Sequence, residues 1–172
     1  ALQIAQKTMP EDWSEEMKRP GFKVLHAPDV DFRASCLRFT SCLEVVDRWS
    51  RAHPGHGPLL ILINAKDEPV RMPGAAKVAS FDAAAFDAPD AEIASAFAKG
   101  RLITPDEVQG AHATLREAVS AGGCPTLESA RGRVLIALDD APAKGAAYGG
   151  ARKSLEGRMM FVNRVETSAA AA

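Results

Sequence analysis

The sequence has no excess of charge of either sign. Its 172 residues include 21 lysines and arginines and 22 aspartates and glutamates, which gives a formal net charge of -1. A protein that binds nucleic acid or an anionic membrane through its overall charge carries a strong basic excess. The sequence therefore excludes binding of either partner through overall charge. We expect no nucleic-acid partner, and a membrane would have to be recognised by a local part of the surface.

Long apolar runs are also missing. The longest one, residues 59–63, has the length of a single strand, whereas a helix that spans a bilayer needs about 20 apolar residues. We therefore expect no transmembrane segment.

The motifs of several common enzyme classes are absent. The sequence contains no glycine-rich phosphate-binding loop, no GxSxG, no HExxH and no CxxC pair. Each of these motifs places a phosphate-binding backbone, a nucleophile or metal ligands at a fixed spacing. Nucleotide-dependent enzymes, serine hydrolases and zinc proteases are thereby disfavoured.

What the sequence does contain is typical of one α/β domain. It is 47% hydrophobic and 25% charged, as in ordinary globular proteins, and no composition shift divides residues 1–172. Short apolar runs alternate with helical patterns, which indicates parallel strands joined by helices. Because the runs are almost continuously apolar, we expect these strands to be covered on both faces. The predicted strands are residues 22–26, 59–64, 134–139 and 159–163.

Helical spacing predicts the segments between the strands. Apolar residues recur every three or four positions from Phe39 to Trp49, and the pattern stops before His53, which predicts one amphipathic helix. Residues 80–99 are rich in alanine and predict a second helix, which Pro89 kinks or splits.

Further along the chain, the start of a third helix is marked by a capping box. Thr104 is followed by a proline and then by Glu107, the pattern of an N-cap with its third helical residue. We expect this helix to run toward Val119. Residues 126–130 predict a short helical turn, and residues 140–150, rich in alanine and glycine, predict a mobile loop.

Each predicted strand ends in a polar residue. In parallel sheets the chemistry gathers where the strands end, because the following loops meet there. A polar residue also often ends a strand simply because the chain turns toward solvent, so the pattern admits both interpretations. The residues at these ends are His26, Asn64, Asp139 and Asn163, with Lys66 just beyond the second strand.

His26 is the histidine most suited to catalysis. It follows an apolar strand and precedes a loop with Asp29 and Asp31, either of which can orient an imidazole. We interpret it as a candidate general acid or base, with a structural histidine as the alternative. His53 and His56 lie between a helix end and a strand start, at the edge away from the chemistry, where a two-histidine metal site is less favoured.

Two of the three cysteines are close in sequence. Cys36 and Cys42 flank the start of the first helix, a spacing that can close a small disulfide loop in an oxidising compartment. In a cytosolic protein the same residues would be ordinary small side chains. Cys124 is left without a partner.

Several segments follow one another in a distinctive order and spacing. They include PGFKVLHAPDVDFRASC at 20–36, WSRAHPGHGPLLILINAKD at 49–67, RLITPDEV at 101–108, GCPTLESARGRVLIALDD at 123–140 and LEGRMMFVN at 155–163. Together they resemble the secreted bacterial calcium-dependent phosphatidylinositol-specific phospholipase C family, and the similarity covers nearly the whole chain.

The resemblance implies a TIM (β/α)8 barrel that cleaves phosphatidylinositol with two histidines and Ca²⁺. One histidine activates the inositol 2-hydroxyl, which attacks phosphorus and forms a cyclic inositol phosphate. His26 corresponds to the other, which assists the departure of diacylglycerol. The first histidine and the acidic calcium ligands are expected upstream of residue 1. We therefore expect a partial barrel with parallel strands, inactive as this piece.

The resemblance also suggests roles for three strand-end residues. Asn64 stands at the position of a calcium ligand, where its neutral amide oxygen can coordinate the ion. Lys66 is the nearest cation for the substrate phosphate. Asp139 stands where eukaryotic relatives carry lysines that bind ring phosphates, which favours plain phosphatidylinositol.

Other functions remain open at this stage. A glycerophosphodiester phosphodiesterase shares the barrel but attacks with water, and a non-catalytic barrel domain could bind lipid or protein. For the leading interpretation, the expected partner is a phospholipid at a membrane surface, and the expected location is secreted or periplasmic.

Overall fold

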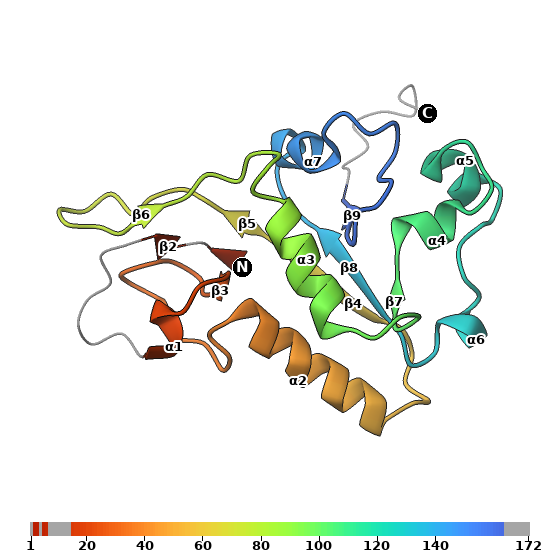
Figure 1. Cartoon of the computed structure of the whole chain (residues 1–172), viewed down its shortest axis with the longest axis horizontal. Coiled ribbons are helices and arrows are strands. Elements are labelled where there is room, and N and C mark those ends of the chain that lie inside the picture. Colours follow the sequence, from red (N-terminus) through yellow and green to blue (C-terminus); the bar gives the residue numbers. More distant parts are fainter. Residues whose placement is uncertain (1, 4, 7–14, 164–172) are drawn as a thin grey trace.

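The computed structural model describes residues 2–3, 5–6 and 15–163 (Figure 1). Helices and strands alternate along most of this length, as expected for an α/β protein. In chain order the elements are β1 (Leu2–Gln3), β2 (Ala5–Gln6), α1 (Glu15–Lys18), β3 (Lys23–Val24), α2 (Phe39–Ala52), β4 (Leu59–Ile63), β5 (Ala65–Lys66), β6 (Lys77–Val78), α3 (Asp87–Ala96), β7 (Leu102–Ile103), α4 (Pro105–Gln109), α5 (Leu115–Ser120), α6 (Leu127–Ala130), β8 (Val134–Leu138), α7 (Pro142–Gly149) and β9 (Phe161–Val162).

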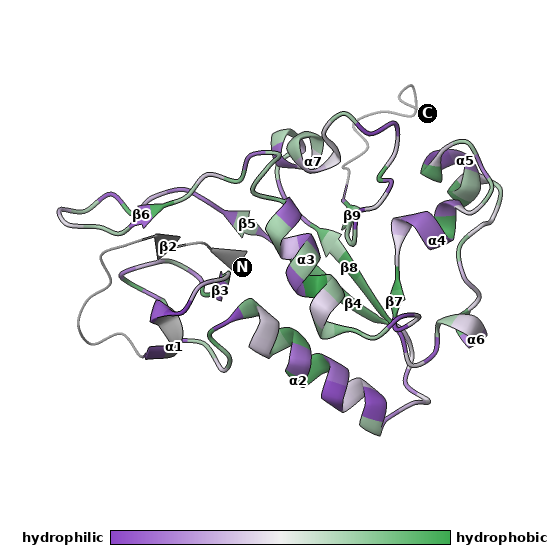
Figure 2. Cartoon of the chain, viewed as in Figure 1, coloured by the Kyte–Doolittle hydropathy of each residue, from purple (hydrophilic) through white to green (hydrophobic). Residues whose placement is uncertain are grey.

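The main sheet consists of parallel strands around β8. All five residues of β4 pair with all five of β8, from Leu59 opposite Val134 to Ile63 opposite Leu138. The short strands β7 and β9 also run parallel to β8. The prediction of an α/β fold with parallel strands is confirmed for this sheet, and Figure 2 shows its strands in the hydrophobic colour.

A second, smaller sheet departs from the expected pattern. Strand β1 lies between β3 and β5, antiparallel to β3 and parallel to β5, so the prediction that 22–26 form a parallel strand is wrong. Only Lys23–Val24 form the strand, and the Val24 N–H donates to the Leu37 carbonyl. Together with the β2–β6 pair, the described strands form three separate sheets, not one continuous barrel wall.

The hydrophobic core lies between the main sheet and the helices α2 and α3. Phe39 and Leu43 of α2, Ile93 of α3 and Ile136 of β8 are all buried in one cluster. Strand β8 is covered on both faces, as expected. The same expectation is wrong for β4, because Leu60 and Leu62 are 60% and 54% exposed.

The amphipathic helix predicted from Phe39 is confirmed as α2, whereas the alanine-rich segment is helical only in its second half. Helix α3 begins at Asp87, and Pro89 lies in its first turn, where its missing N–H costs no helical hydrogen bond. Phe81 and Phe86 precede the helix and are buried, with ring centroids 5.2 Å apart. Their burial holds this stretch out of the helix.

The predicted helix from Thr104 to Val119 is two helices. Thr104 Oγ1 accepts from the Glu107 N–H at 3.3 Å, which confirms the cap of α4. The helix stops at Gly110, whose φ of 52° is readily adopted by glycine. A second cap at Thr114 then starts α5, and the short turn α6 follows as predicted.

Most of residues 140–150, predicted as a mobile loop, form helix α7 (Pro142–Gly149). Helix α7 has a proline at its start and ends at Gly149, with Gly150 as its C-cap. Tyr148 is fully buried in the core, and this burial fixes the segment against the sheet. Across the described part of the chain, no helix has the length and apolarity to cross a membrane.

Candidate functional site

The residues after three parallel strands are joined by hydrogen bonds. Asn64 Nδ2 donates to the Asp139 carbonyl at 2.8 Å, and Asn163 Nδ2 donates to Asp139 Oδ1 at 2.7 Å. These bonds continue the ladder of the sheet, since the Asp139 N–H donates to the Ile63 carbonyl. The carboxyl edge of β4, β8 and β9 thus brings together two of the residues predicted for the site, Asn64 and Asp139.

A lysine of α7 links this edge to the chain that follows β5. Lys144 Nζ lies 2.8 Å from Asp67 Oδ1 and 3.8 Å from Asp140 Oδ2, and it donates to the Ala65 carbonyl. Asp140 in turn accepts from the Ala65 N–H at 2.8 Å. The side chain of Lys144 is 15% exposed. We call Asp67, Asp140 and Lys144 the lysine bridge.

The lysine bridge changes the acidity of Asp67. Burial by itself raises the pKa of this carboxyl, but the bond to Lys144 and the Phe81 N–H together lower it below its ordinary value. Sequence reasoning missed Lys144 because residues 140–150 were expected to be a mobile loop. The helix-starting proline at Pro142 was the available signal.

His26 is an exposed side chain next to Asp31. Its Nδ1 lies 3.1 Å from Asp31 Oδ2, and the side chain is 73% exposed. The backbones of Ala27 and Asp31 exchange two hydrogen bonds that close the loop. Within the part of the chain that the structure describes, the side chain of Asp31 is the only polar partner of the ring.

Strand β1 lies between the two strands next to His26 and Asn64. Val24 and Ala65 both lie opposite Leu2, on its two sides, so β3 and β5 are two strand spacings apart, about 10 Å. His26 follows Val24 and Asn64 precedes Ala65. Since β3 is antiparallel to β1 and β5 is parallel, both residues lie toward the start of β1. No direct contact joins them.

Lys66 lies on β5, two residues after Asn64 and toward the end of β1. It is partly buried and pairs with Gln3 across the sheet. Its ammonium group forms no ion pair with a described residue.

The described residues do not by themselves form a calcium site. Ca²⁺ takes six to eight oxygen ligands. No group of three or more His, Cys, Asp or Glu residues within the described ranges could hold a metal ion. Asn64 offers one amide oxygen, and the carboxylate of Asp139 accepts from Asn163 through Oδ1.

The other histidines lie away from His26. Near the C-terminus of α2, the ring of His53 stacks on Trp49 and that of His56 is tilted against it, with centroids 4.5 and 5.2 Å from that of the indole. His26 follows β3, which lies against the start of the same helix. A helix of 14 residues is about 21 Å long. His112 is exposed between α4 and α5, and no second histidine lies beside His26.

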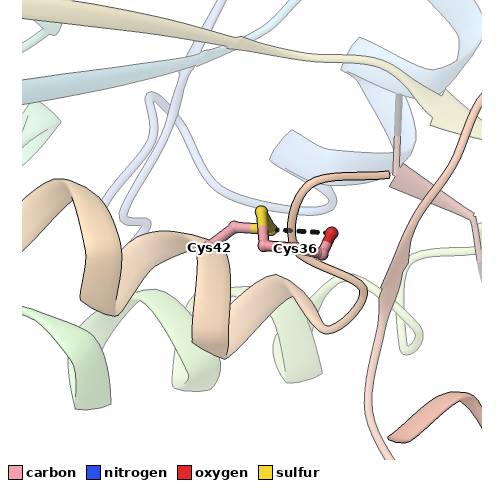
Figure 3. The surroundings of a disulfide bond; sticks show 2 residues. All are labelled: Cys36 and Cys42. Atoms are coloured by element: carbon pink, nitrogen blue, oxygen red, sulfur yellow. Dashed lines mark hydrogen bonds between the residues drawn. A yellow bond between two sulfur atoms is a disulfide. The ribbon is translucent and has the colours of Figure 1, made fainter. Parts of the chain in front are cut away.

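Cys36 and Cys42 form a disulfide at the start of α2 (Figure 3). Their Cα atoms are 5.4 Å apart, within the usual range for this bond. Cys124 is free and exposed. The open choice between a disulfide and two ordinary thiols is thus decided in favour of the disulfide.

Comparison with known proteins gives a consistent result. The family model described as phosphoinositide phospholipase C, Ca²⁺-dependent, matches residues 1–172. A calcium-dependent phosphoinositol-specific phospholipase C from Pseudomonas sp., a Gram-negative bacterium, shares 26% identity with a TM-score of 0.54 over 73% of this chain and 41% of that chain. A Ca²⁺-dependent phosphatidylinositol-specific phospholipase C from Streptomyces antibioticus shares 27% identity with a TM-score of 0.56 over 76% of this chain and 43% of that chain.

The chain thus spans about two fifths of the length of these solved structures. No curated protein matches it.

Proposed function

This chain belongs to the calcium-dependent phosphoinositide phospholipase C family, and on that premise we propose that it supplies the His26 part of an enzyme that cleaves phosphatidylinositol. The products are diacylglycerol and a cyclic inositol phosphate. The observation that carries the proposal is an exposed imidazole held by Asp31 at the same end of β1 as Asn64. Both solved relatives are calcium-dependent enzymes of this type.

The pair of His26 and Asp31 suits proton transfer. With its Nδ1–H donating to the carboxylate of Asp31, the ring is oriented and its Nε2 is left to hold or move a proton. In the proposed reaction the protonated Nε2 donates to the oxygen of the departing diacylglycerol. Asp31 acts as a positioning residue, since it reaches the substrate only through the imidazole.

The strand-end residues are proposed to bind the substrate and the ion. Lys66 provides a cation for the phosphate, and Asp139 favours an inositol ring without further phosphates because a carboxylate repels them. Asn64 is proposed as one calcium ligand. Calcium binding needs further oxygen ligands besides those of the described residues.

We also propose that these 172 residues are inactive on their own. The two-histidine reaction needs an acid and a base on opposite sides of one phosphorus, and the other three histidines of the chain do not lie beside His26. The location is proposed as secreted or periplasmic, which agrees with the Cys36–Cys42 disulfide.

The test is an assay of phosphatidylinositol cleavage by the full-length gene product that contains this chain. His26→Ala is expected to lower turnover by about 10²–10⁴-fold, the contribution of a positioned acid or base. His112→Ala is the matched control, and it is expected to leave turnover unchanged. Retention of full activity in His26→Ala would remove the assignment and favour a structural histidine.

The product distinguishes the second enzyme candidate. Attack by the inositol hydroxyl releases inositol 1,2-cyclic phosphate, whereas a glycerophosphodiester phosphodiesterase uses water and forms no cyclic product. Phosphorus NMR of the early products separates the two. If the full-length protein forms neither the cyclic phosphate nor a product of water attack, a non-catalytic lipid- or protein-binding domain is favoured.

A further inference from the structure

His26 begins a tight turn that is closed by backbone hydrogen bonds. The His26 and Ala27 N–H groups both donate to the Asp31 carbonyl, at 3.2 and 2.9 Å, and the Asp31 N–H donates to the Ala27 carbonyl at 2.9 Å. These bonds bring Asp31 alongside His26, where its Oδ2 lies 3.1 Å from Nδ1 of the ring. We call residues 26–31 the histidine turn.

The pair of His26 and Asp31 depends on the turn that carries it. Their side chains are 73% and 61% exposed. A contact between two such exposed side chains stabilises little by itself, because water competes for both partners and ordering the side chains costs entropy. The backbone of the histidine turn therefore determines how the two side chains face each other.

Asp29 lies at the tip of the histidine turn in a left-handed conformation. Its φ is 66°, and within the described ranges it is the only residue other than glycine with a positive φ. Aspartate and asparagine adopt this conformation more readily than other residues with a side chain, but it still costs free energy. Such a conformation persists only where the surrounding structure holds it.

The carboxylate of Asp29 provides a contact that holds this conformation. Its Oδ2 accepts from the Ala76 N–H at 2.9 Å, although the two residues are 47 positions apart. Ala76 is 4% exposed, and a buried N–H without an acceptor is costly. Pro28, next to Asp29, is fully buried. The tip of the histidine turn is thereby attached to a buried part of the molecule, while His26 itself stays exposed.

We propose that Asp29 is a positioning residue for His26 and acts through the backbone of the histidine turn. The bond to Ala76 holds the left-handed conformation, and this conformation places Asp31 beside the ring. Asp31 then accepts the Nδ1 proton, which keeps Nε2 in one orientation. Glycine would adopt the same φ but has no acceptor for the Ala76 N–H, so aspartate serves both requirements.

This inference rests on the proposed function, because a fixed imidazole affects turnover only where His26 transfers a proton. A misplacement of about 1 Å in such a group can cost about 10²-fold in rate. Asp29→Ala in the full-length protein is therefore expected to lower kcat for a soluble short-chain phosphatidylinositol by roughly 10- to 100-fold. KM should change little, because Asp29 acts on the ring and not on the substrate.

Two further substitutions separate the hydrogen bond from the backbone conformation. Asp29→Asn keeps both, since its amide oxygen accepts from the Ala76 N–H and asparagine adopts a positive φ, so it should retain most of the activity. Asp29→Gly keeps the φ but loses the acceptor, and its kcat should lie between those of Asp29→Asn and Asp29→Ala. It also replaces Asp29→Ala if that variant does not fold. A loss in Asp29→Asn as large as in Asp29→Ala would overturn the proposal.

Asp106 provides the matched control. Its carboxylate also joins distant segments, because Oδ1 accepts from the Gly157 N–H at 3.0 Å. It lies on α4, and Figure 1 shows the main sheet between α4 and β3. Asp106→Ala should leave kcat unchanged. Equal losses in Asp29→Ala and Asp106→Ala would reflect lost stability and would remove the positioning role.

The ring of His26 gives a readout that does not depend on catalysis. Nitrogen-15 NMR of the full-length protein with labelled histidine reports which ring nitrogen of a neutral imidazole carries the proton, and His26→Ala identifies the signal. In wild type and Asp106→Ala the proton of His26 should lie on Nδ1. In Asp29→Ala it should be shared between Nδ1 and Nε2, a change that a merely structural role of Asp29 would not produce.

The two measurements separate this inference from the proposed function. If His26→Ala remains active while Asp29→Ala changes the position of the ring proton, the catalytic role of His26 fails and the positioning role of Asp29 stands. If His26→Ala is inactive while Asp29→Ala keeps the kcat and the ring proton of wild type, the positioning role fails alone.

Discussion

Arg158 Nη1 lies 3.0 Å from Asp90 Oδ2, and both side chains are enclosed, with exposed fractions of 2% and 11%. The buried pair is part of a network in which Asp90 Oδ1 accepts from the Tyr148 hydroxyl at 2.6 Å and Arg158 Nε donates to the Tyr148 carbonyl. The network ties α3 and α7 to the chain entering β9. It therefore holds α3 and α7 against this part of the chain.

The first prediction concerns the two aspartates that share Arg158. Asp90→Ala leaves a buried guanidinium without its enclosed partner and should lower the free energy of unfolding by about 3–5 kcal/mol. Asp87→Ala removes a contact of the same Nη1 atom at 2.8 Å, but its side chain is 71% exposed. It should cost no more than about 1 kcal/mol. Urea unfolding measures both, and equal losses would contradict a buried network.

The second prediction uses the single tyrosine of the chain. Burial and the nearby charge of Asp90 raise the pKa of Tyr148 far above its ordinary value of 10.0. Because the folded state keeps the phenol neutral, this contribution to stability is complete below pH 10. It is lost as the pH rises further, when the unfolded chain ionises.

Ultraviolet difference absorbance during an alkaline titration measures this directly. Phenolate should appear only together with unfolding, which circular dichroism follows in parallel. Ionisation of Tyr148 in the folded protein near pH 10 would show that the phenol is accessible.

The third prediction concerns the lysine bridge. Lys144→Met removes the ammonium that bonds to Asp67 and should lower stability at pH 7 by about 1.5–3 kcal/mol, the range for hydrogen bonds to charged groups. Since the folded state lowers the pKa of Asp67, its contribution is complete above the unfolded pKa of about 3.9. It is lost as the pH falls through the lower folded value.

The difference between wild type and Lys144→Met should therefore shrink in strong acid. Urea midpoints at neutral pH and below pH 3 measure the change. Lys66→Met is a matched control on the neighbouring strand, since Lys66 forms no ion pair with a described residue. A constant difference at all pH values would show that Lys144 stabilises the fold by packing alone.

The fourth prediction concerns the disulfide. Cys36→Ser with Cys42→Ser opens a small loop at the start of α2 and should lower stability by about 2 kcal/mol on the loop-entropy estimate. Cys124→Ser should have no effect, because that thiol is free and exposed. Thermal unfolding with and without a reducing agent measures the loss. If a reducing agent destabilises the double variant as much as wild type, the loss of stability does not come from the Cys36–Cys42 disulfide.

Features set by near neighbours in the chain were predictable from the sequence. The spacing of apolar residues predicted α2, and the pattern from Thr104 to Glu107 predicted the cap that the structure contains. Its extension to Val119 was wrong, because the chain turns at Gly110 and starts again at Thr114. The apolar runs identified the strands β4 and β8 to within one residue.

Only the part of the site that lies at the ends of the parallel strands was predictable from the sequence. The α/β pattern predicted parallel strands with converging ends, and Asn64 and Asp139 meet because β4 and β8 are also adjacent. The catalytic role of His26 stays a prediction. The strand before His26 was predicted to be parallel to its neighbours, whereas β3 runs antiparallel to β1. Nothing local in the sequence indicated that Lys144 bonds to Asp67.

The sequence by itself determined the family, the extents of the strands β4 and β8 and the local helix signals, because these depend on residues within a few positions of one another and on motif order. Only the tertiary structure decided that Arg158 pairs with Asp90, that Lys144 pairs with Asp67, and that the Asp29 carboxylate accepts from the Ala76 N–H. The partners in these contacts are 68, 77 and 47 positions apart. Contacts of this kind form only when packing brings distant segments together, so no short-range pattern records them.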